Sequence, residues 1–273
     1  NLLDAKDTAA YTDTGIWGYK AIKEAKLFGK VEVVCSSREK VYNYIPKDFA
    51  VPNDARYLHI TTNNTLYGSR YSAFPDAGNV PLIADQTSEI LSRVVDYSKF
   101  GCIYAGLQKN LGPSGTAIVV IREDLLGYAS PETPVLLNYE QCAKDNSLTN
   151  TANTFAIYVT GLVLEWLQEQ GGVAAIEKIN EQKAKTLYDL IDAGDYYRGV
   201  ILPECRGTMN VSFNLASEEL EAKFLKEAGA QGLYALKGHR SVGGIRASIY
   251  NAMPLAGVET LAEFMREFES KNG

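Results

Sequence analysis

Short apolar segments alternate with a helical segment and polar loops through the first half of this 273-residue chain. The apolar segments are rich in β-branched residues and lack a clean period of two, which is typical of strands buried on both faces. This alternation predicts an α/β fold with a mainly parallel central sheet and helices on both faces. We expect strands over residues 31–34, 57–61, 81–84, 101–105 and 116–121, and a helix over residues 16–28.

The second half of the chain has a different pattern. Helices are expected over residues 155–168 and 173–192, separated by Gly171 and Gly172. The order that follows is strand, helix, strand and helix, over residues 209–215, 218–230, 244–249 and 258–271. We therefore expect two domains, a large one over residues 1–172 and a smaller α+β domain over residues 173–273.

Two chemically distinctive residues follow strands of the expected sheet. Asp85 lies at the end of one apolar strand, and Lys109 lies in a turn rich in glycine after a later one. Ligands of α/β folds bind where strands end, and this pair is what pyridoxal phosphate (PLP) chemistry needs. The lysine would hold the cofactor as a Schiff base, and the aspartate would keep the pyridine nitrogen protonated. The residues alone also allow a purely structural interpretation, in which the aspartate caps a turn and the lysine only lies on a solvated surface turn.

Six segments, in one collinear order, give the chain a family resemblance. They are Trp17–Ala25, Asn64–Gly68, Ala84–Ser88, Ile103–Asn110, Asn150–Phe155 and Lys237–Ser248. In these segments the chain closely resembles the phosphoserine aminotransferases, which are PLP enzymes of the transferase fold type I. The resemblance implies that Lys109 binds PLP and that Asp85 is the partner of its pyridine nitrogen. After the substrate has displaced it, the Lys109 amine would move a proton between the substrate Cα and the cofactor C4′.

Five further residues belong to the cofactor site that the resemblance implies. Trp17 would stack on the pyridine ring and Thr65 would donate to the phenolic oxygen, although on their own they read as a core aromatic and a loop threonine. Gln108, Asn150 and Thr151 suit a phosphate, and residues 150–154 also have the composition of a helix N-cap. In the family the Asn–Thr pair reaches the phosphate of the neighbouring subunit, which implies a homodimer with shared sites.

Three cationic or titratable side chains gather near the end of the chain. His239, Arg240 and Arg246 lie within eight residues of an otherwise acidic sequence. Arg246 would bind the substrate α-carboxylate in a bidentate pair, and His239 and Arg240 would bind the distal anion. The other histidine, His59, lies in an apolar strand and is interpreted as a core residue.

The resemblance implies reversible transamination between O-phospho-L-serine and 2-oxoglutarate, giving 3-phosphohydroxypyruvate and L-glutamate in serine biosynthesis. The family also acts on a phosphorylated hydroxythreonine in pyridoxine biosynthesis. Family members carry a further N-terminal segment, with a phosphate-binding turn and a His–Arg pair, before the position where this chain begins. Two alternatives to this activity remain. One is another fold-type I reaction, such as that of a lyase or desulfurase, and the other is an impaired aminotransferase fragment that only folds and dimerises.

Composition narrows the class of partner. The formal net charge of −6 argues against nucleic acid and anionic membranes. The first residues have no apolar signal region, and the longest apolar stretch, residues 155–167, is too short for a bilayer span. The four cysteines are far apart, which predicts reduced thiols and no metal site. We expect a cytoplasmic enzyme that acts on small molecules.

Overall fold

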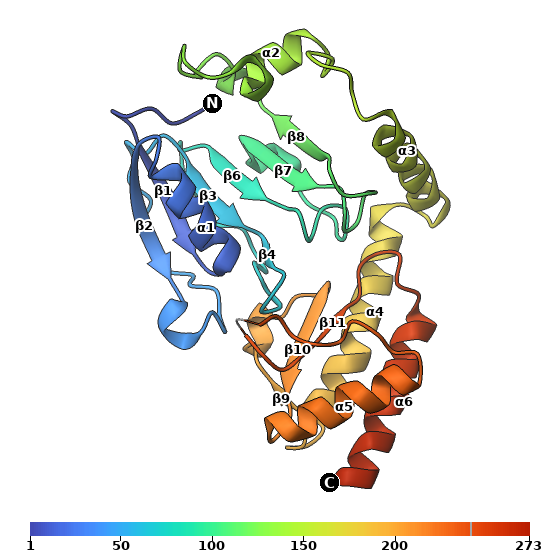
Figure 1. Ribbon diagram of the computed structural model, residues 1–273. Coiled ribbons are helices and arrows are strands. Elements are labelled where there is room, and N and C mark those ends of the chain that lie inside the picture. The colour runs from blue at the N-terminus through green and yellow to red at the C-terminus, as the bar shows by residue number, and fades with distance from the viewer. Residues whose placement is uncertain (241) are drawn as a thin grey trace.

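A six-stranded sheet forms the frame of the first half of the chain in the computed structural model, which describes residues 1–240 and 242–273 (Figure 1). Its strand order is β2-β1-β3-β6-β7-β8. The strands are β1 (Thr8–Asp13), β2 (Lys30–Ser36), β3 (Leu58–Thr61), β6 (Leu82–Asp85), β7 (Cys102–Gly106) and β8 (Ala117–Ile121). All neighbours run parallel except β7 and β8, so the expected mainly parallel sheet is confirmed.

Strand β1 is the strand of the large sheet that the sequence analysis missed. It lies between β2 and β3, and five of its six residues are buried. Its sequence, TAAYTD, carries small and hydroxylated residues instead of the β-branched apolar run that marks a buried strand. Its place between two other strands, not its own propensity, therefore makes it a strand.

The two faces of the large sheet have separate apolar clusters. Helix α1 (Ile16–Ala25) packs on one face, where its Ile22 joins Tyr11 and Ile83. On the other face Leu58 and Ile60 pack against tyrosines of the following loops and against Ile201 from much later in the chain. Apolar burial on both faces explains why the strands lack a period of two.

A second, three-stranded sheet has the order β11-β10-β9 and is antiparallel. Its strands are β9 (Arg198–Gly199), β10 (Asn210–Asn214) and β11 (Ile245–Ser248). Helices α4 (Val173–Asp192), α5 (Glu218–Ala230) and α6 (Leu255–Asn272) pack with it around an aromatic core that includes Phe213, Phe224 and Phe268 (Figure 1). This cluster is separate from those of the large sheet, although the domain limits of 172 and 173 stay a prediction.

The remaining elements lie in the connections between these strands and helices. They are the hairpin β4 (Asn63–Asn64) and β5 (Ser69–Arg70), the helices α2 (Tyr139–Lys144) and α3 (Thr154–Glu169), and the 3-10 helices η1 (Arg38–Lys40), η2 (Tyr97–Lys99), η3 (Glu123–Leu125), η4 (Val135–Leu137) and η5 (Pro203–Cys205). The chain turns between α3 and α4 at Gly171 and Gly172, whose φ values are +93° and +77°. These left-handed conformations suit glycine.

Within the described residues, no helix combines the length and the apolar character that a bilayer span requires. The same residues contain no group of three or more His, Cys, Asp or Glu side chains arranged to hold a metal ion. The four cysteines are free thiols.

Candidate active site

Asp85 occupies the carboxyl end of β6, where the strand register places it between Thr61 of β3 and Tyr104 of β7. Its Oδ1 accepts a hydrogen bond of 2.9 Å from the Thr87 backbone N–H. This bond fixes the carboxylate at the start of the turn that follows the strand. Asp85 therefore lies at a strand end, as the sequence predicted.

Lys109 lies in the turn that follows the neighbouring strand β7. The backbone N–H groups of Leu111 and Gly112 both donate to the Leu107 carbonyl oxygen, at 3.0 and 2.8 Å, which closes the turn around the lysine. The Lys109 Nζ atom donates to the Thr65 Oγ1 atom at 2.7 Å. The lysine is thus held by a specific partner and does not extend freely into solvent.

The surroundings of Lys109 change its acidity. Burial lowers the pKa of Lys109 from 10.5 to about 8, the Asp85 carboxylate opposes this shift, and the Arg246 guanidinium adds to it. These effects require the three charged groups to lie near one another. The structure therefore gathers Lys109, Asp85, Arg246 and Thr65 in one cluster.

Thr65 reaches this cluster because the chain turns sharply between β4 and β5. The Gly68 N–H donates to the Asn64 carbonyl oxygen at 2.8 Å, and Gly68 has a φ of +89°. A Cβ atom at Gly68 would lie 2.5 Å from the Asn210 carbonyl oxygen of β10. Only glycine lets the Thr65 turn approach the small sheet this closely.

Arg246 approaches from β11, paired in register with Ser212. Its Nη1 donates to the Thr65 carbonyl oxygen at 3.5 Å, which is a long hydrogen bond. Its Nε is buried and has no hydrogen-bond partner among the described residues. A partly buried arginine with an unused donor suits a carboxylate ligand.

Trp17 lies in the first turn of α1 and is 40% exposed. The Lys20 ammonium lies 4.6 Å from the centre of its ring. Gly15, two residues earlier, packs so closely that a Cβ atom there would clash with the Asn64 Oδ1 atom. The start of α1 therefore lies against the turn that carries Thr65.

The three expected phosphate ligands are exposed side chains. The side-chain amide of Gln108 lies over Gly106, where a Cβ atom would clash with the Gln108 Oε1 atom. Asn150 and Thr151 are exposed too, in the segment before α3, and the Asn150 Nδ2 atom donates to the Thr151 carbonyl oxygen at 3.4 Å. The expected helix cap is formed by Asn153, which accepts from the Ala156 N–H at 3.1 Å. Their role at a phosphate stays a prediction.

His239 and Arg240 lie on a tight turn before β11. The N–H groups of Val242 and Gly243 both donate to the His239 carbonyl oxygen at 2.8 Å. His239 is partly buried and Arg240 is exposed. Ser241, which belongs to the longest segment of the family resemblance, lies outside the described residues.

His59 is a core residue, as expected, but a polar one. Its Nε2 atom lies 2.8 Å from the Tyr104 hydroxyl, and its ring stacks on Tyr11 at 4.7 Å between centroids. Burial lowers the pKa of His59 to about 4, and the nearby Asp85 carboxylate opposes that shift. Sequence reasoning gave no role to Tyr104, although the strand alternation could have placed it beside Asp85.

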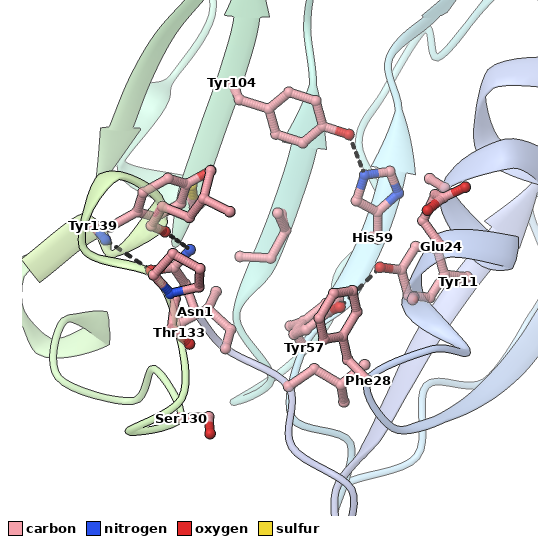
Figure 2. Close-up of a pocket in the computed structure, with 18 of the residues that line it drawn as sticks. Asn1, Tyr11, Glu24, Phe28, Tyr57, His59, Tyr104, Ser130, Thr133 and Tyr139 are labelled. Carbon is pink, nitrogen blue, oxygen red and sulfur yellow. Dashed lines mark hydrogen bonds between the residues drawn. The ribbon is translucent and has the colours of Figure 1, made fainter.

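A cavity of about 750 Å³ opens on the face of the large sheet that carries His59 and Tyr104 (Figure 2). Figure 2 shows His59, Tyr104, Tyr11 and Tyr57 on its walls, with Tyr139 on the opposite side. None of the Lys109 cluster lines it. Tyr104, which pairs in register with Asp85, is one of its lining residues, so the cavity reaches the strand next to Asp85.

The aminotransferase class-V family model matches residues 1–261. This chain belongs to the class-V aminotransferases. It is 51% identical over 275 residues to the phosphoserine aminotransferase of Desulfatibacillum aliphaticivorans, with 100% of this chain and 76% of the relative covered. The chain therefore spans about three quarters of the length of that relative.

Solved structures agree with this assignment. The phosphoserine aminotransferase from Bacillus circulans subsp. alkalophilus is 47% identical, with a TM-score of 0.98 over 100% of this chain and 76% of that one. The enzyme from Trichomonas vaginalis, solved with PLP bound, is 34% identical, with a TM-score of 0.89 over 97% of this chain and 77% of that one. The expected family and the fold type I architecture of this aminotransferase are confirmed.

Proposed function

We propose that this aminotransferase uses PLP to transfer an amino group between O-phospho-L-serine and 2-oxoglutarate. The products are 3-phosphohydroxypyruvate and L-glutamate. The observation that carries the proposal is the cluster of Lys109, Asp85, Thr65 and Arg246, in a chain 51% identical to a phosphoserine aminotransferase. A covalent anchor, a carboxylate and a guanidinium with an unused donor are the three groups that the reaction needs.

The residues of the cluster fit PLP. Lys109 supplies the primary amine that binds the cofactor aldehyde, Asp85 a carboxylate for the pyridine nitrogen, and Thr65 a hydroxyl beside them. Trp17 supplies an aromatic face at the start of α1. When bound, PLP supplies the electron sink that makes the substrate Cα–H acidic.

Once the substrate amine has displaced it from the cofactor aldehyde, the freed Lys109 amine would act as the base that removes the Cα proton. A lysine with its pKa lowered to about 8 by burial carries a far larger neutral fraction near neutral pH than an ordinary lysine. Thr65 orients the amine through its 2.7 Å hydrogen bond. A positioned base whose pKa lies near the working pH transfers protons efficiently.

Arg246 holds the substrate by its α-carboxylate. Its Nη1 contacts Thr65, which also contacts Lys109, so the guanidinium and the amine share one neighbour. A carboxylate bound at Arg246 would therefore present its Cα close to the Lys109 amine. His239 and Arg240, seven and six residues before Arg246, are assigned to the distal phosphate or carboxylate.

A second copy of the chain is the partner that we assign. Helix α3 exposes a row of large apolar side chains close to Asn150 and Thr151. They are Phe155 (69% exposed), Ile157 (56%), Tyr158 (64%) and Leu162 (45%). Apolar patches of this kind mark interfaces between proteins, so a homodimer would bring Asn150 and Thr151 to the partner's cofactor phosphate. A cytoplasmic location is part of the same proposal.

The test of substrate assignment compares two amino donors. Arg240→Gln should lower kcat/KM for phosphoserine by about 10- to 100-fold, because a hydrogen bond to a charged group contributes about 1.5–3 kcal/mol. With alanine as the donor the same variant should change little. Lys237→Gln, an exposed position on the same turn, is the matched control. Equal losses for both donors would contradict the assignment of Arg240 to the distal anion.

A further inference from the structure

We propose that four buried polar side chains, Asn110, Asn180, Lys183 and Asn251, form a positioning network that sets the Lys109 amine against the Arg246 guanidinium. The inference rests on the proposed function and deepens it, because it assigns positioning residues to the same site. None of the four belongs to the cluster that contacts cofactor or substrate. They act through the segments that carry Asp85, Lys109 and Arg246.

The network is organised around the turn after β6. Three consecutive carbonyl oxygens of this turn, those of Ile90, Leu91 and Ser92, each accept one asparagine amide. The donors are Asn110 Nδ2 at 3.0 Å, Asn251 Nδ2 at 2.9 Å and Asn180 Nδ2 at 2.9 Å. The three asparagines come from three different segments, so the turn that begins at Asp85 joins all of them.

The turn itself has an unusual backbone that these bonds can hold. Leu91 has a φ of +55°, a left-handed conformation that is unfavourable for leucine. The carbonyl groups of Leu91 and of its neighbours Ile90 and Ser92 are those that accept the three asparagine amides. A strained conformation persists when surrounding contacts determine it from several sides.

The asparagines are also bonded to one another. The Asn251 N–H donates to Asn110 Oδ1 at 3.1 Å, and Asn180 Nδ2 donates to Asn251 Oδ1 at 2.9 Å. Asn110 follows Lys109 directly, and Asn251 lies five residues after Arg246. A hydrogen-bonded path therefore connects the lysine turn to the strand that carries the arginine.

Lys183 holds the far end of this path. Its Nζ donates to the carbonyl oxygens of Ile249, Tyr250 and Met253, at 3.0, 2.8 and 3.0 Å. All three donor positions of the ammonium are thus used on the segment that contains Asn251. Because the lysine belongs to α4, the ammonium ties the end of β11 to that long helix.

Burial gives the network its rigidity. The exposed fractions of Asn110, Asn251, Asn180 and Lys183 are 7%, 5%, 1% and 0%. A buried polar group that loses its partner costs more than an exposed one, so every member constrains its neighbours. Apolar side chains could fill the same space, but they would not fix the relative orientation of Lys109 and Arg246 through directional bonds.

The test removes Asn251 and measures the Lys109 amine directly. In the cofactor-free chain, the pH at which an amine reagent half-labels Lys109 should move upward in Asn251→Ala, because the lysine becomes less confined. In the PLP-loaded enzyme, kcat/KM for phosphoserine should fall at least about tenfold, the size of effect expected when positioned groups are misplaced. Asn110→Ala should give the same two changes, and it carries the test if Asn251→Ala does not fold.

Leu261→Ala is the matched control, because Leu261 is buried in the core around α6 and touches no network residue through a hydrogen bond among the described contacts. It should lower stability yet leave the Lys109 labelling midpoint unchanged. A midpoint and a kcat/KM that stay at the wild-type values in both asparagine variants would overturn the network. Absence of PLP binding at Lys109 in the wild-type chain would instead overturn the proposed function.

Discussion

The chemistry of this aminotransferase depends first on one amine. Lys109 is confined by Thr65 and by the turn around Leu107, and burial lowers its pKa to about 8. At pH 8 about half of such an amine is neutral, whereas an ordinary lysine with a pKa of about 10.4 is almost wholly charged. The neutral amine is the form that attacks an aldehyde or accepts a proton.

Labelling of Lys109 with an amine reagent in the cofactor-free chain should therefore rise with pH through a midpoint near 8. The measurement is mass spectrometry of peptides after brief labelling at a series of pH values. A Lys109 midpoint near the ordinary lysine value of about 10.4 would contradict the described burial.

The two charged neighbours of Lys109 should shift this midpoint in opposite directions. The Asp85 carboxylate favours the charged amine, so Asp85→Asn should lower the midpoint. The Arg246 guanidinium disfavours it, so Arg246→Gln should raise the midpoint. Shifts of the same sign in both variants would show that the three groups do not form one electrostatic cluster.

At the scale of elements, the turn between β4 and β5 couples the two sheets. Gly68→Ala meets both an unfavourable φ of +89° and the Asn210 carbonyl oxygen at 2.5 Å, whereas Gly78→Ala meets an unfavourable φ of +59° and open space. The second change should lower the free energy of unfolding by about 1–2 kcal/mol, the backbone penalty alone. The first should add about 1–3 kcal/mol for the clash. Urea denaturation measures both, and equal losses would contradict the close approach.

How much of the fold could be predicted varies from element to element. The helices α4 (Val173–Asp192) and α5 (Glu218–Ala230) have the predicted bounds, because amphipathic spacing and Ser217 or Gly172 mark where they begin. Strand β1 could not be predicted, since its small side chains acquire strand character only by pairing with two neighbours. Local sequence patterns were enough to predict these two helices, whereas β1 depends on pairing with strands that are distant in the sequence.

The functional site, too, could be predicted from the sequence only in part. Asp85 ends β6 and Lys109 lies in the turn after the neighbouring strand β7, so the expectation that both follow strand ends was enough to relate them. The contact between Arg246 and Thr65 joins residues 181 positions apart and depends on how the small sheet meets the hairpin, which no local pattern contains. The network through Asn251 was missed for this reason. Buried asparagines are also indistinguishable from loop asparagines in a sequence.

At the scale of the whole molecule, the exposed face of α3 should hold two copies together. Replacing Phe155 and Tyr158 by aspartate removes the two most exposed aromatic side chains of that helix and places charges in the interface. We expect the double variant to be a folded monomer by light scattering after size exclusion, with the wild type a dimer. Glu165→Gln, an exposed change on the same helix, should stay dimeric. A monomeric wild type would contradict the assignment of this face.

The central claim is that Lys109 binds PLP. The most direct measurement is to add PLP to the chain, fix it by borohydride reduction and locate the modified lysine by peptide mapping, with Lys109→Arg as the control. The cluster predicts one pyridoxyl group, on Lys109, and none there in the variant. Modification spread over exposed lysines, with Lys109 unmodified in a folded chain, would contradict the assignment of the active site.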